Sequence, residues 1–218
     1  MRRHSEKPAL LSRRWRGALA STLAFAVLLP AAARAGQAGR VPAALDDMTA
    51  AGAQVRALAQ RAGTWDVSIT SWAFPGADPV ALKGLVAERS MIGPMLQEIL
   101  RSPRGGARPF VRADFLTFNR LEGRWQYMSM DSRVPDGMMS AWSLDADPEN
   151  RIFVSFLPFA NPDATDPASP FTAGRFLRME QVIVRSDADH EIKDQYFTAA
   201  GSAPVKWLAM QYRYTRRR

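Results

Sequence analysis

The sequence predicts an all-β protein, an antiparallel β-barrel of about 8–10 strands preceded by one short helix. Two observations predict this class. After Gly63, apolar and polar residues alternate with period two in about ten separate runs. Short segments rich in Gly, Pro, Asp and Asn separate these runs. A barrel is favoured over a sandwich because hairpin-length connections dominate and a closed sheet has no exposed edge.

Residues 1–35 have the layout of an export signal. A basic start leads into an apolar run over 18–29, and a small-x-small site at 33–35 predicts cleavage before Gly36. The apolar run is shorter than the ~20 residues that span a bilayer, so a transmembrane anchor is disfavoured. The paired arginines at 13–14 resemble a twin-arginine motif, while the general secretory route stays open. We therefore expect a periplasmic or secreted protein without a membrane anchor after cleavage.

The charge of the chain is concentrated in this leader. The whole chain carries 29 Lys+Arg against 21 Asp+Glu, a formal net charge of +8. Residues 1–35 hold seven of the basic and one of the acidic residues, which leaves 22 basic and 20 acidic residues, or +2. No nucleic-acid partner is therefore expected. The chain has no cysteine, so the apolar core has to supply the stability without disulfides.

The elements follow in order from residue 36. Residues 36–62 are expected to form a flexible lead and a short amphipathic helix over 45–61, which tolerates Gly52 in its interior. Residues 63–218 form the barrel domain. The predicted strands are 64–74, 80–92, 95–101, 110–118, 124–132, 138–145, 151–157, 175–186, 191–199 and 205–215.

Two segments stand out within the barrel domain. Residues 116–145 give the clearest signal, a three-stranded meander in which two tight turns separate runs rich in aromatic residues and Met. Residues 158–174 carry four prolines and two aspartates and are too long for a hairpin. This connection is either a lid over one barrel mouth or, the favoured alternative, a disordered surface excursion.

The opening of the first strand resembles a known motif. Gly63-Thr64-Trp65 resembles the Gly-x-Trp opening of the calycin barrels, the lipocalins and their relatives. That resemblance implies that Trp65 closes one barrel end and that an Arg or Lys near the last strand lies across it. Arg213 or Arg216 fits this second role, through a cation–π contact worth ~0.5–2 kcal/mol.

A second resemblance covers about 58–216. The stretch 90–98, together with 125–132 and 137–139, is similar to the bacterial family known as domain of unknown function 1579. This implies an exported, calycin-like antiparallel barrel with no settled activity. Where the family often has Gly-Gly-Arg, this chain has Ile92-Gly93-Pro94, which leaves the geometry of that turn open.

The composition gives little basis for metal or nucleophile chemistry. After residue 35 the chain has one histidine, His190, in a predicted polar turn, and no cysteine. A Ser-His-Asp triad or haem ligation through His190 is disfavoured against a solvated turn residue. We expect neither a metal nor a cofactor.

Paired carboxylates are the next candidate. Glu180 and Asp194 lie on neighbouring predicted strands, and pairing Ser186 with Glu191 would place them on opposite faces. A register change of one residue would reverse this. A working acid/base pair is therefore disfavoured.

The run 124–132 has two contrasting faces. Met128 and Met130 form one of them. The other is a ladder of stacking and hydrogen-bonding groups, Trp125, Tyr127, Ser129 and Asp131. Either the Met face fills the core, or the ladder lines a wide barrel. The Met face is the favoured core, because methionines at this spacing more often fill cores than form binding surfaces.

Aromatic residues spread over the other strands keep a ligand cavity in view, because several must face inward in any register. They are Trp142, Phe153, Phe156, Phe176, Tyr196, Trp207 and Tyr212. A barrel of this size has room for one small ligand.

The favoured function is therefore binding of a small, largely apolar molecule inside the barrel. Its expected lining is Trp125, Tyr127, Asp131, Trp142 and Tyr196. One alternative is a small-molecule isomerase or hydrolase that uses Asp131 or Glu180 with Tyr196. Another is a structural or interaction module of the cell envelope, which a filled barrel without a cavity would indicate.

Overall fold

The computed structural model describes residues 51–103, 105, 109–134, 137–143, 150–161, 174–200 and 204–218. The predicted export signal over 1–35 and most of the 158–174 connection lie outside these residues. No helix in the described part of the chain has the length and apolar character needed to cross a membrane. The elements are α2 Ala53–Ala59, β1 Gly63–Ser71, β2 Val80–Ile92, β3 Met95–Arg101, β4 Val111–Asn119, β5 Arg124–Asp131, β6 Met138–Trp142, β7 Arg151–Phe156, β8 Phe159–Ala160, β9 Phe176–Arg185, β10 His190–Ala199 and β11 Val205–Arg216.

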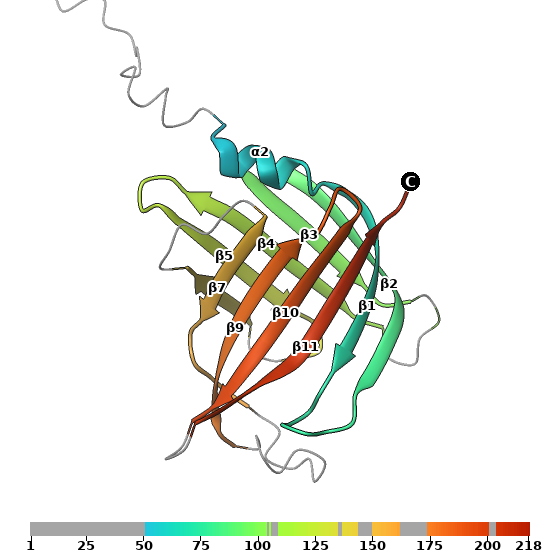
Figure 1. The fold of residues 1–218 in the computed structure, drawn as a ribbon, viewed down its shortest axis with the longest axis vertical. Coiled ribbons are helices and arrows are strands. Elements are labelled where there is room, and N and C mark those ends of the chain that lie inside the picture. The colour runs from blue at the N-terminus through green and yellow to red at the C-terminus, as the bar shows by residue number, and fades with distance from the viewer. Residues whose placement is uncertain are drawn as a thin grey trace, which may run out of the picture. The chain divides into compact units, whose positions relative to one another are not determined.

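Ten strands form one closed antiparallel barrel (Figure 1). Hydrogen bonding follows the order β10-β11-β1-β2-β3-β4-β5-β6-β7-β9, and the pairing of β9 with β10 closes the ring. The predicted all-β barrel with a short preceding helix is confirmed. The two-residue strand β8, which pairs with β9, was not predicted, because it lies inside the connection interpreted as a loop.

The strand bounds follow the period-two pattern closely, and each predicted strand is present within three residues of its expected ends. The predicted meander is β4-β5-β6. The described part of the helix expected over 45–61 is α2, which begins at Ala53, because Gly52 is its N-cap residue in extended conformation (φ −68°, ψ 176°) rather than an interior residue. Residues 45–50 of the expected helix lie outside the described residues. The Ile92–Met95 turn has Gly93 at φ +57°, the conformation that a two-residue hairpin loop requires at its first position.

The two ends of the barrel differ. The helix α2 contacts β2, β3 and β4 and lies across one end, called here the helix end (Figure 1). β1 starts at the helix end and β11 finishes there. The opposite end, called the far end, holds Ser71, Val80 and Ala199 at the other tips of their strands.

Strand β5 shows which face of the wall is inner. Trp125, Tyr127 and Ser129 are buried, whereas Met130 is 38% exposed. The favoured interpretation, with the Met face in the core, is therefore wrong. The physical reason lies across the sheet: the inner positions of neighbouring strands carry charges, and Ser129 supplies a hydrogen bond to one of them, Asp114.

Apolar side chains fill the remaining interior in three clusters. One lines β3 to β7 and β9, a second lines β1, β2 and β11, and a third lies toward the far end on β9 to β11. Polar residues interrupt this core near its middle, and they define the candidate site.

Candidate functional site

The helix end is closed by an arginine–tryptophan stack. Trp65 is fully buried, and the guanidinium carbon of Arg216 lies 4.2 Å from its ring centroid. Arg89 lies 5.0 Å from the same centroid. Of the two residues suggested for this role, Arg216 occupies it. Arg213 does not, because Tyr212, Tyr214 and Arg216 take the inner positions of β11 and leave Arg213 exposed.

Arg216 also ties the chain end to the segment before β1. Its Nη1 and Nη2 donate to the carbonyl oxygens of Ala62 and Gln60, each at 2.6 Å, and its Nε donates to that of Ala188 at 3.1 Å. A Cβ at Gly63, where φ is +130°, would lie 2.7 Å from Nη1. The backbone conformation therefore favours glycine at this position of the Gly-x-Trp motif, and a side chain there would also displace the Nη1 of Arg216.

Replacing Arg216 by glutamine is expected to lower the free energy of unfolding by about 1–3 kcal/mol, because the cation–π contact and three hydrogen bonds are lost. Arg213→Gln, on the same strand but exposed, is the matched control and should change it by less than about 0.5 kcal/mol. Urea unfolding of both variants measures the difference. Equal effects would contradict the assignment of Arg216 as the closing residue.

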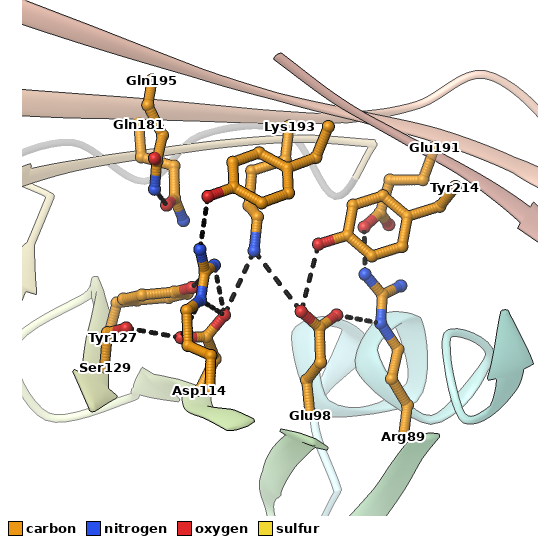
Figure 2. Close-up of polar contacts among 12 residues, drawn as sticks. Arg89, Glu98, Asp114, Tyr127, Ser129, Gln181, Glu191, Lys193, Gln195 and Tyr214 are labelled. Carbon is orange, nitrogen blue, oxygen red and sulfur yellow. Dashed lines mark hydrogen bonds and ion pairs between the residues drawn. The ribbon is translucent and has the colours of Figure 1, made fainter. Parts of the chain in front are cut away.

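The interior holds seven buried charged side chains in an alternating chain. The order of contact is Arg61, Glu191, Arg89, Glu98, Lys193, Asp114 and Arg112. Cations and anions therefore alternate, with a cation at each end. Figure 2 shows Lys193 reaching between Asp114 and Glu98, with Glu191 and Arg89 toward one side. We call this set the charge chain.

Distances within the charge chain are those of hydrogen-bonded ion pairs. The Nζ of Lys193 lies 3.1 Å from a carboxylate oxygen of Asp114 and 3.4 Å from one of Glu98. Arg89 donates to Glu98 at 2.6 Å and to Glu191 at 2.8 Å. Because β10 lies across the barrel from β3 and β4, Lys193 bridges opposite walls.

The strand period places these charges inside. On β10 the buried residues Glu191, Lys193 and Gln195 alternate with less buried ones. Neighbouring tyrosines form hydrogen bonds with two members of the charge chain. Tyr214 donates to Glu98 at 3.0 Å, and Tyr212 accepts from Arg112 at 2.6 Å. A buried charge is tolerated when it is paired and hydrogen-bonded in this way.

The pairing keeps the carboxylates ionised. Burial acts to raise the pKa of Asp114, but the charges of Arg112 and Lys193 outweigh it and hold that pKa well below its ordinary value of 3.8. The same competition, with Lys193 and Arg89 as the opposing cations, lowers the pKa of Glu98. Burial also lowers the pKa of Lys193, but Glu98 and the tyrosines outweigh this and raise it.

Two cavities adjoin the charge chain. A small one of about 20 Å³ is lined by charge-chain residues and by Tyr127, which gives room for about one water molecule. Arg89 Nη1, which has no hydrogen-bond partner among the described residues, is a donor that such a water would satisfy.

The larger cavity, of about 650 Å³, lies toward the far end. Its apolar lining includes Met139, Phe159, Leu177, Met179, Phe197 and Met210. We call its buried polar lining the polar floor: Arg112, Ser129, Gln195 and Tyr212. The charge chain therefore ends at the floor of this cavity, through Arg112. A smaller pocket of about 250 Å³ shares Met139 and Phe159 with it.

The structure places three of the five predicted lining residues at the inner wall. Asp131 lines the large cavity, where it pairs with Arg133. Tyr127 lines the small cavity, and its hydroxyl lies 3.4 Å from Arg112. Trp125 lines neither cavity and packs edge-on against Phe118, with ring centroids 5.0 Å apart.

The other two predicted lining residues lie on the outer face. Trp142 pairs with Gln126, between the buried positions of β5, and stacks under Arg124 at 5.6 Å. Tyr196 lies under the Nζ of Lys206 at 5.0 Å. Neither lines a cavity, so the ligand contacts predicted for them have no support in this placement.

The carboxylates considered for acid/base chemistry also lie on the outer face. Glu180 pairs across the strands with Tyr196, one residue from the expected register, which puts Glu180 and Asp194 on the same face. Glu180 forms an ion pair with Lys206, and Asp194 accepts from Gln211 at 2.9 Å. The expectation of opposite faces is therefore wrong.

Asp131 is the one predicted acid inside. Burial acts to raise its pKa, but hydrogen bonds and the charge of Arg133 outweigh burial and lower the pKa. A carboxyl held ionised in this way is not available as a general acid.

No metal centre is evident in the described part of the chain, where no three His, Cys, Asp or Glu side chains are grouped to hold an ion. His190 is exposed in the turn before β10 and pairs with Asp187 at 2.9 Å. This is the solvated turn residue that the sequence favoured.

Comparison with known proteins adds only distant likenesses. The sequence matches no family model and no curated protein. Among solved structures, the chain is similar to a redesigned β-barrel, with 9% identity and a TM-score of 0.35 over 75% of this chain and 96% of that one. It is also similar to Rv2717c from M. tuberculosis, with 16% identity and a TM-score of 0.47 over 77% and 99%. At these values neither likeness carries an argument about function.

Proposed function

We propose that this chain is an exported barrel that binds one small, largely apolar molecule in the cavity at the far end. The observation that carries the proposal is the cavity itself. Its volume of about 650 Å³ falls within the range of small-molecule sites, ~300–1,000 Å³. A filled barrel was the sign expected of a purely structural module, and the far end is not filled.

The composition of the lining favours an apolar ligand with a few polar contacts. Phe159 and Phe197 stack edge-on with centroids 5.8 Å apart, and Phe197 continues to Trp207 at 5.7 Å. The polar floor supplies a few buried polar groups within a lining that is otherwise mostly apolar. This is the usual composition of pockets that orient an apolar molecule.

The rim of the far end supports the same ligand class. Val80, Leu157 and Phe176 lie at or beside strand tips of this end and are 68%, 56% and 62% exposed. Val80 also lines the large cavity, so exposed apolar surface lies at the edge of the site.

The export signal predicted from the sequence and the resemblance to a calycin-like family support the proposal. The layout of residues 1–35 motivates export, and the resemblance to the domain of unknown function 1579 family stays a prediction. Intact mass of the exported protein tests the first, because cleavage before Gly36 leaves residues 36–218. A mass that includes residues 1–35 would count against it.

Filling the cavity is expected to abolish binding. Ala209 lines the cavity, so Ala209→Phe places a ring in the volume that the ligand would occupy. Ala81→Phe is the matched control, because Ala81 is exposed on β2 near the same end. Native mass spectrometry and thermal shift with a panel of lipophilic compounds measure binding by both variants and the parent protein.

The expected result is a bound adduct and a raised melting temperature for the parent protein and Ala81→Phe, and neither for Ala209→Phe. Circular dichroism confirms that Ala209→Phe is folded. An apo mass for the parent protein, with no stabilisation by any compound, would contradict the proposed function.

A further inference from the structure

The charge chain contains one more cation than anion. Its buried members are four cations and three anions. Each inner member touches two groups of opposite charge, whereas Arg112, at one terminus, forms an ion pair with one carboxylate of the chain. The Arg61 terminus lies at the helix end, directly after α2. The Arg112 terminus faces the large cavity, so a ligand in this cavity can approach the excess positive charge.

Arg112 has a hydrogen-bond donor to spare. Its Nε donates to both carboxylate oxygens of Asp114, at 3.0 and 2.9 Å, and Nη2 donates to Asp114 at 2.5 Å. Nη2 also lies 3.4 Å from the Tyr127 hydroxyl, and Nη1 donates to that of Tyr212 at 2.6 Å. Five N–H groups are present on a guanidinium, so one N–H of Nη1 has no acceptor among the described residues.

An amide pair adjoins this donor in the polar floor. Gln195, which lines the cavity, donates through Nε2 to Oε1 of Gln181 at 2.9 Å. The Nε2 of Gln181 is buried and has no partner among the described residues. Figure 2 shows both amides on the side of the network near Tyr127 and Ser129, away from Arg89. The floor therefore presents a cation through Arg112 and an amide through Gln195, whose second N–H has no acceptor among the described residues; the Gln181 amide, whose Nε2 is unpaired among these residues, is hydrogen-bonded to Gln195.

We propose that the molecule bound in the large cavity carries one carboxylate, which accepts hydrogen bonds from Arg112 and Gln195 and completes the alternation of the charge chain. This rests on the proposed function, since it names the chemical class of that ligand: a monocarboxylic acid with an apolar body. The carboxylate becomes the fourth anion and balances the four buried cations. Hydrogen bonds between ionised partners are about twice as strong as neutral ones, so this end of the ligand sets its orientation.

The cavity also argues against a second acidic group. Asp131 lies in the lining beside Arg133 and is already paired with it through hydrogen bonds of 2.9 and 2.5 Å. A second carboxylate near this pair would meet a neutralised arginine and a fixed negative charge. Outside the polar floor, the rest of the lining is apolar apart from Ser71, Asp78 and Asn161, which suits an aliphatic or aromatic body.

Three ligands that share one chain test the inference: decanoate, 1-decanol and decylamine, titrated calorimetrically into the full-length exported protein at neutral pH. Decanoate is expected to bind at least tenfold more tightly than decanol, and decylamine most weakly. Arg112→Gln removes the excess charge and leaves three cations and three anions. This variant should lose the tenfold preference for decanoate while its affinity for decanol stays within about twofold.

Arg133→Gln is the matched control, because it removes a cation of the cavity that is already neutralised. It should keep at least half of the preference for decanoate. Melting curves of the ligand-free variants show whether each is folded. If Arg112→Gln does not fold, the preference of the parent protein for acid over alcohol and amine decides the matter.

The outcomes separate the two proposals. Decanol bound as tightly as decanoate, or decylamine bound more tightly, would overturn the carboxylate and leave the apolar cavity in place. A preference for decanoate that survives in folded Arg112→Gln would overturn the role of Arg112. Failure of all three ligands to bind, with the lipophilic panel also silent, would reject the proposed function itself.

Discussion

Asp114→Ala is expected to lower the free energy of unfolding by about 3–5 kcal/mol, because it leaves buried cations without their anion. Asp114 contacts Arg112 and Lys193 and accepts from Ser129 at 2.6 Å. Its loss would leave two anions against four cations in the charge chain, and the buried Lys193 would keep Glu98 as its one carboxylate within the chain. Chemical unfolding monitored by tryptophan fluorescence measures the change.

Two further variants test whether the loss of stability comes from the excess of buried positive charge. Lys193→Met removes a cation from the same network and balances the remaining three against three, so it should cost clearly less than Asp114→Ala. Glu122→Gln, in an ion pair with Arg124 whose side chains are 49% and 30% exposed, should cost less than about 1 kcal/mol. If Lys193→Met proves as costly as Asp114→Ala, the excess of positive charge does not govern the stability of the interior.

The architecture could be predicted from local pattern, because hairpin strands and their turns are neighbours in sequence. The β2–β3 turn illustrates this: Gly93 supplies the positive φ that a two-residue loop requires. Trp65 could be assigned to a barrel end by resemblance, since the motif around it is local. The choice between Arg213 and Arg216 depended on the parity of β11, which changes along the strand: Trp207 and Ala209 are buried in its first half and Tyr212 and Tyr214 in its second, with an irregular register against β10 between them.

The charge chain could not be predicted in the same way. Lys193 is 79 residues from Asp114 and 95 from Glu98, so no local spacing encodes their contact. On β10 both faces carry polar residues, and Glu191 and Lys193 have the appearance of a solvated face. The available signal was weak: the inner ladder of β5 ends in Ser129 and Asp131, and polar groups at inner positions indicate polar partners across the barrel.

The register of β9 against β10 explains why Glu180 and Asp194 were expected on opposite faces of the sheet. A shift of one residue exchanges the two faces of a strand, and the turn after Ser186 is one residue tighter than expected. In this turn Asp187 accepts the backbone N–H groups of Asp189 and His190, at 2.7 and 2.8 Å. That local hydrogen bonding sets where β10 begins.

Acidification is expected to unfold the protein through the same carboxylates. The folded-state pKa values of Asp114 and Glu98 are lowered from ordinary values of 3.8 and 4.5. Below these ordinary values the unfolded chain binds protons that the folded chain does not, so the free energy of unfolding falls as pH falls. Above about pH 5 both groups are ionised in either state, and the contribution of the charge chain is complete.

The measurement is the free energy of urea unfolding from pH 7 to pH 3, in the parent protein and two variants. Asp114→Asn removes one titrating group from the interior and should flatten the fall below pH 4, from a lower starting stability. Asp66→Asn is the control, because the pKa of Asp66 is also lowered, by a hydrogen bond from Arg217, but the carboxylate is exposed and screened by solvent. Its pH profile should run parallel to that of the parent protein. A parent profile that stays level to pH 3 would show that the buried carboxylates do not depend on their charge, and the charge chain would lose its role as the feature that holds the two walls of the barrel together.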